Sequence, residues 1–83
     1  MKESVVKLTT NLLDSALSRD TEQGLVVFRK ALELLGEAGS EAEILSVLEK
    51  LNKALVGIEA HGYLTSEEFG WVKELREIEE AGV

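Results

Sequence analysis

The segment from Gly62 to Phe69 constrains the fold more than any other part of the chain, because it specifies where one helix ends and another begins. Glycine commonly closes a helix in the left-handed conformation, so Gly62 predicts a helix end. Thr65, followed three residues later by Glu68, has the spacing of a capping box, and the helix that it opens has Phe69 as its first apolar residue. The segment therefore predicts a helical hairpin.

The rest of the chain follows the same pattern. Apolar residues recur with a period close to 3.6, and no segment alternates as a strand would. Ser40 with Glu43 is a second capping box. We expect four helices: Ser4 to Ser18; from a cap at Asp20 (with Gln23) or Thr21 to Gly36; Glu41 to about His61; and Thr65 to a frayed end near Ala81.

Short connections favour helices that run back along their predecessors. We therefore predict an all-α fold in which four short helices form an antiparallel bundle of two helical hairpins, as a single domain over residues 1–83. Two glycines inside expected helices, Gly24 and Gly57, are candidates for close helix crossings, and a bend is the equal alternative at Gly57. The residues expected to face the core are Val5, Leu8, Leu12, Leu13, Ala16, Leu17, Leu25, Phe28, Leu32, Leu35, Ile44, Val47, Leu48, Leu51, Ala54, Leu55, Ile58, Phe69, Val72, Leu75 and Ile78.

Composition excludes several classes of protein. The 83 residues include no cysteine, which removes disulfides, zinc–thiolate sites and thiol catalysis. The N-terminal residues contain no uninterrupted apolar run, so we do not expect a signal peptide. No segment approaches the roughly 20 apolar residues that a membrane span requires. These observations lead us to expect a cytoplasmic protein without a membrane association.

The charge balance argues against nucleic acid as the partner. Sixteen acidic against nine basic residues give a net charge of −7, which repels phosphates. A transcriptional regulator of the helix-turn-helix type stays open as the alternative function. Its recognition helix would use one of three basic pairs: Arg29 with Lys30, Lys50 with Lys53, or Lys73 with Arg76. Acidic residues beside these pairs disfavour phosphate contact; they are Glu33, Glu49, Glu74 and Glu77.

The sequence offers no catalytic constellation. Its one histidine, His61, falls at the expected end of the third helix, where it complements the exposed carbonyl groups. A di-metal bundle site would need Glu-x-x-His, but Ile58 stands three residues before His61. No phosphate-binding glycine pattern and no EF-hand loop is present. We therefore expect no enzyme activity, no cofactor and no bound metal.

Surplus apolar residues point instead to binding. The second and third helices carry more large aliphatic residues than one buried face needs, which suggests a partner protein or a homodimer. Val26 and Val27 are the candidate contacts there. On the fourth helix, Trp71 beside Gly70, with Glu74, has the composition of an interface anchor. The alternative is that the valines are ordinary surface residues and that Trp71 covers one end of the core.

Two families resemble parts of this pattern. The segment from Leu51 to Lys73 resembles the short helical-hairpin motif called SHOCT through Gly62, Leu64-Thr65, Glu67-Glu68-Phe69 and Lys73. That family normally ends in a leucine pair, where this chain has Arg76-Glu77. The resemblance implies a scaffolding or oligomerising role. The expected plan of four short helices is also similar to small bacteriocin-immunity proteins, which are often basic.

Taken together, these features predict a small acidic protein-binding module. An inhibitor, an immunity factor, an adaptor and an assembly subunit all fit this description.

Overall fold

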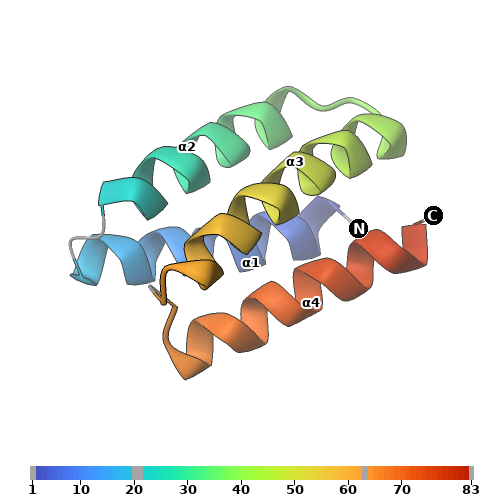
Figure 1. Ribbon diagram of the computed structural model, residues 1–83. Helices are drawn as coiled ribbons and strands as arrows, with labels where there is room; N and C mark the ends of the chain where they lie inside the picture. Colours follow the sequence, from blue (N-terminus) through green and yellow to red (C-terminus); the bar gives the residue numbers. More distant parts are fainter. Residues whose placement is uncertain (1, 20–21, 63, 83) are drawn as a thin grey trace.

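The computed structural model describes residues 2–19, 22–62 and 64–82, and it confirms an all-α fold. Figure 1 shows the four helices of this described part. Helix α1 spans Lys2–Arg19, α2 spans Glu22–Glu37, α3 spans Glu41–Ala60 and α4 spans Ser66–Gly82. The first helix begins two residues before its predicted start and ends one residue later. The expected cap at Asp20 or Thr21 lies outside the described residues.

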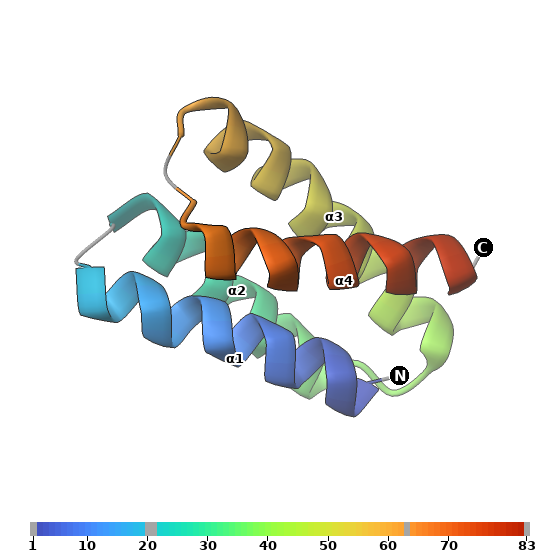
Figure 2. The ribbon, with the colours of Figure 1, turned by 90° about the horizontal axis from the view of Figure 1, so that it is seen from below.

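The helices run alternately up and down, so the ends of α1 and α4 that lead to the two termini lie at the same end of the bundle (Figures 1 and 2). Helices α1 and α3 each pack against both α2 and α4, and they also meet across the short diagonal. In the described part of the chain, α2 and α4 do not contact each other. This order leaves the α2–α3 pair on one side of the bundle and the α1–α4 pair on the opposite side.

The predicted helix signals are confirmed where the structure describes them. The Ser40 hydroxyl accepts a hydrogen bond from the Glu43 backbone N–H at 3.2 Å and begins α3. At α4 the capping box is complete in both directions: Glu68 N–H donates to Thr65 Oγ1 at 3.1 Å, and Thr65 N–H donates to Glu68 Oε1 at 2.8 Å. Gly62 has a φ of +73°, the left-handed conformation expected after a helix end.

One contiguous core joins all four helices, and most of the predicted core residues belong to it. Two predictions were wrong: Leu17 is 49% exposed and Phe69 is 42% exposed. In α4 the inward positions are Glu68, Val72 and Leu75, so Phe69 lies about 100° around the helix from that stripe. Leu17 follows the buried Ala16 and is displaced from the core in the same way.

Asn52 is a buried polar residue on α3, only 6% exposed. Its side-chain nitrogen donates to Leu75 O at 3.4 Å and to Glu79 Oε1 at 2.6 Å, which ties α3 to α4. Its Oδ1 atom has no hydrogen-bond partner among the described residues. A buried acceptor without a donor costs about 1–3 kcal/mol, so this position matters for the packing of α3.

The two candidate crossing glycines differ. A Cβ atom added at Gly24 would lie 3.2 Å from a ring carbon of Phe28 and 3.4 Å from Ala16 Cβ, so α1 and α2 approach closely there. Nothing lies within 4 Å of the same position at Gly57, so the prediction of a close crossing was wrong for that residue.

Candidate functional site

An apolar groove runs between α2 and α3. It encloses about 440 Å³, and seven of its nine lining residues are apolar. The lining residues are Val26, Val27, Lys30, Ala31, Leu34, Val47, Lys50, Leu51 and Ala54. On α2 they follow the spacing i, i+1, i+4, i+5, i+8, and on α3 the spacing i, i+3, i+4, i+7, so each set forms one face of its helix. The groove is therefore built by two apolar helical stripes that lie side by side.

Both predicted contact residues of α2 belong to this groove. Val26 is 67% exposed, whereas Val27 is half-buried and packs against the core. Leu34 and Val47 also line a smaller hollow that adjoins the groove. Because the two helices are antiparallel, Leu34 lies at the end of the groove near the α2–α3 loop, and Val26 lies toward the opposite end.

The two charged residues of the groove are lysines, one from each helix. Lys30 lies 3.8 Å from Glu33 in an exposed i,i+3 pair, which contributes little because solvent screens it. Within the described part of the chain, Lys50 forms no ion pair. The groove thus combines an apolar floor with two positive charges on a protein whose net charge is −7.

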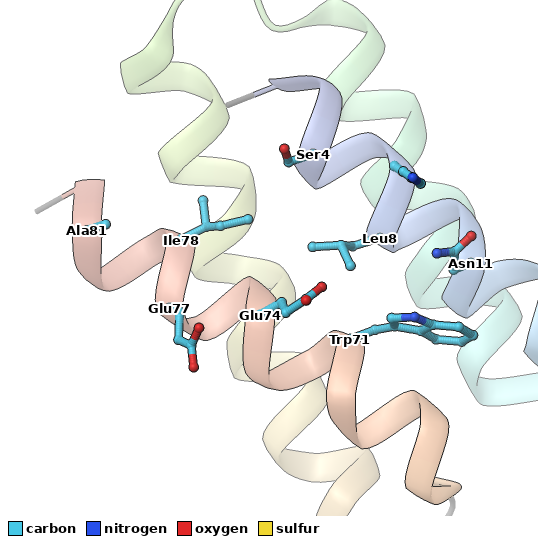
Figure 3. A pocket seen from close by; sticks show the side chains of 9 residues that line it. Ser4, Leu8, Asn11, Trp71, Glu74, Glu77, Ile78 and Ala81 are labelled. Atoms are coloured by element: carbon cyan, nitrogen blue, oxygen red, sulfur yellow. The ribbon is translucent and has the colours of Figure 1, made fainter.

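A second groove, of about 600 Å³, lies between α1 and α4 (Figure 3). In Figure 3 the Trp71 indole extends from α4 toward α1 near Asn11, and Leu8 extends toward α4 from the other wall. Glu74 points into the groove, while Glu77 points away from α1. Lys7 contributes a positive charge to the same surface. This groove is consequently more polar than the α2–α3 groove.

The predicted contact residues, which the sequence divides into two patches, lie on two sides of the bundle. Val26 and Val27 lie on the α2–α3 side, and Trp71 and Glu74 lie on the α1–α4 side. The sequence named Lys30 and Lys50 only as members of basic pairs for nucleic acid, and it assigned Val47, Leu51 and Ala54 to the core and not to a contact surface. The sequence signal that could have identified this surface is helical spacing. It places four groove residues on one face of α3: Val47, Lys50, Leu51 and Ala54.

Gly70 is exposed, and nothing lies within 4 Å of the position where its Cβ atom would be. Since glycine lowers helix stability by about 1 kcal/mol relative to alanine, we expect Gly70→Ala to raise the free energy of unfolding by about that amount. Urea denaturation measures the change. Gly57→Ala is the matched comparison. That position is equally open, so the free energy of unfolding should rise by a similar amount. A loss of stability on Gly70→Ala alone would contradict this account of an unobstructed glycine.

A buried carboxylate joins the C-terminal end of α1 to the N-terminal end of α4. Glu68 is 1% exposed, and its Oε1 accepts from Arg19 Nη2 at 2.7 Å. Burial opposes ionisation of this carboxyl, but hydrogen bonds from Thr65 and Ser15 and the Arg19 charge outweigh it, so the pKa of Glu68 lies below its ordinary value of 4.5. The sequence identified Glu68 as a cap and missed its ion pair.

The basic pairs named for a helix-turn-helix lie beside carboxylates. Lys53 Nζ is 3.3 Å from Glu49 Oε1, and Arg76 Nη2 is 2.5 Å from Glu59 Oε2. The second of these pairs joins α3 to α4. His61 is the C-cap residue of α3, and the backbone N–H of Gly62 donates to Glu59 O at 2.9 Å.

Among the described residues, no group of three or more His, Cys, Asp or Glu side chains is arranged to hold a metal ion. None of the helices in the described part of the chain combines the length and hydropathy needed to cross a membrane.

In comparisons with known proteins, no family model, curated protein or solved structure matches this chain.

Proposed function

We propose that this protein acts by binding another protein, and that the α2–α3 groove is its principal contact surface. The observation that carries the proposal is the open apolar floor of this groove, from which Val26 projects with 67% of its surface exposed. Exposed apolar surface that is concave and continuous is typical of protein-binding sites. A partner that fills the groove would remove this surface from water, which provides the driving force for association.

The α1–α4 groove supplies a second contact surface in this proposal. Tryptophan is enriched among the residues that dominate interface energies, and Trp71 has Glu74 beside it for a polar contact. Because the two grooves lie on opposite sides of the bundle, one molecule can contact two others at once. This arrangement suits an adaptor or an assembly subunit, and a single occupied groove suits an inhibitor or an immunity factor.

The proposal is tested by quantitative affinity capture from the source cells with matched baits. Val26→Asp places a carboxylate in the groove, whereas Val56→Asp makes the same change at another exposed valine, 57% exposed and outside the groove. We expect Val26→Asp to reduce the retained partner at least tenfold, equivalent to about 1.4 kcal/mol. Val56→Asp should retain the wild-type amount.

Trp71→Ala in the same experiment separates the two surfaces. If it releases a different protein from the one released by Val26→Asp, each groove has its own partner. Circular dichroism confirms that every bait is folded. Unchanged capture by the Val26→Asp bait would contradict the α2–α3 groove as the principal contact surface, and unchanged capture by the Trp71→Ala bait would exclude the α1–α4 groove as the second one.

A further inference from the structure

The α2–α3 groove has the dimensions to accept a helix. Its α2 wall extends from Val26 to Leu34, nine residues that span about 12 Å of helix axis. A bound helix covers that length with side chains at positions i, i+4 and i+7, the spacing by which amphipathic helices anchor in apolar grooves. The lining side chains of α2 and α3 form two stripes that lie side by side with a hollow between them. A third helix can pack its side chains against such a surface.

The charge of the groove selects among such helices. Its two ammonium groups, on Lys30 and Lys50, come from opposite walls, so they flank whatever lies on the apolar floor. Lys30 forms only a solvent-exposed i,i+3 ion pair with Glu33 at 3.8 Å, which water screens, and Lys50 has no ion pair within the described residues. Both are thus available to pair with acidic residues on either side of a partner's apolar stripe.

A second copy of the chain fits this surface less well. A two-fold contact through the same groove would bring Lys30 and Lys50 of both copies to one interface, and like charges close together oppose association. Nucleic acid fits less well too, since most of the lining is apolar and presents little to phosphate groups.

We propose that the α2–α3 groove binds an amphipathic helix of a partner protein, and that this helix carries acidic side chains on both sides of its apolar stripe. The inference rests on the proposed function and specifies the chemistry of the partner. The apolar stripe occupies the floor between Val27 and Leu51, and the acidic flanks pair with Lys30 and Lys50.

The test uses two synthetic helical peptides of about 18 residues with the same leucine stripe. One carries glutamate on both flanks, and the other carries lysine at the same positions. Because the protein has a net charge of −7, its overall field favours the lysine peptide. A preference for the glutamate peptide can therefore come only from local positive charge, and this makes the comparison decisive.

By fluorescence anisotropy at low salt, we expect the wild-type protein to bind the glutamate peptide about tenfold more tightly than the lysine peptide. The double variant Lys30→Glu with Lys50→Glu should reverse the preference. The control, Lys53→Glu with Lys73→Glu, makes the same change in net charge at exposed residues outside the groove and should keep the wild-type preference.

Three outcomes would overturn the inference: equal binding of both peptides, tighter binding of the lysine peptide to the wild type, or no binding of either peptide. None of these outcomes removes the proposed function, which depends on whether Val26→Asp releases a captured protein. If the glutamate peptide does not bind while Val26→Asp still releases a captured partner, the groove binds a protein segment of another shape or charge.

Discussion

Replacing Asn52 by aspartate is expected to lower the free energy of unfolding by about 3 kcal/mol at neutral pH, the largest loss that we predict for a change of one functional group. The side-chain nitrogen of Asn52 now donates to Glu79 Oε1 at 2.6 Å and to Leu75 O at 3.4 Å. Aspartate puts an acceptor in that place, so a buried carboxylate would face a second carboxylate and a carbonyl oxygen. Urea denaturation at pH 7 measures the loss.

Asn52→Leu is the matched control. It has the same branching and the same number of side-chain heavy atoms, and it removes the unpartnered Oδ1 along with the two hydrogen bonds. Since these effects oppose each other, we expect its stability to stay within about 1 kcal/mol of the wild type. The deficit of the aspartate variant should shrink in acid, where the carboxyl groups take up protons. An aspartate variant as stable as the wild type at pH 7 would show that this contact between α3 and α4 is not formed.

Glu68→Gln is expected to lower the free energy of unfolding by about 2 kcal/mol near neutral pH, because hydrogen bonds to a charged group contribute roughly 1.5–3 kcal/mol. The glutamate accepts from Arg19 Nη2 at 2.7 Å and from Thr65 N–H at 2.8 Å. An uncharged amide weakens both contacts and leaves an N–H₂ group to be satisfied in a site that is 1% exposed.

The effect of Glu68→Gln depends on pH in a defined direction. The pKa of Glu68 is lowered in the folded protein, so its ionised form stabilises the fold fully above the ordinary value of 4.5. This contribution is lost as the pH falls through the lowered pKa. The difference between wild type and variant should therefore be largest at pH 7 and should close in acid, as followed by thermal denaturation at several pH values.

Glu67→Gln is the control for this prediction, since Glu67 lies in the same first turn of α4 and is exposed. It removes the same charge from the helix N-terminus without touching the ion pair. A gap between wild type and Glu68→Gln that persisted unchanged at pH 3 would contradict the account.

Local signals explain why the helices could be predicted. Capping at Ser40 and Thr65 involves residues three apart, and the left-handed turn at Gly62 depends on a single residue type. Nothing distant is needed to recognise either feature. Helical periodicity likewise identified most of the core, because one face of each helix must be buried.

Periodicity was less informative at the edges of those faces. Leu17 and Phe69 are large and apolar, and both lie next to a buried position. Whether such a residue is covered depends on where the neighbouring helix lies, which the sequence of one helix does not specify. At the start of α4, Glu68 occupies the inward position because Arg19 and the helix N-terminus stabilise its charge there.

The candidate contacts were predicted as two separate patches, one around Trp71 and one with Val26 and Val27, and not as grooves between helices. Val26 and Trp71 were recognised by their type, but their distribution over two opposite grooves depends on the order in which four helices pack. The pairing of Arg19 with Glu68 joins residues 49 positions apart. The flanking of the apolar groove by Lys30 and Lys50 likewise requires α2 and α3 to be placed side by side. A single sequence carries no direct record of such contacts.

Methyl-labelled NMR of the protein, alone and with the partner retained in the affinity capture, tests the central claim most directly. We expect the methyl signals of Val26, Val27 and Leu34 to shift or broaden on binding, because these side chains line the α2–α3 groove. The methyl signals of Val56 should stay in place. Changes centred on the methyl groups of Leu8 and Ile78 in the α1–α4 groove, or no change at any methyl group, would contradict the claim that the α2–α3 groove is the principal contact surface.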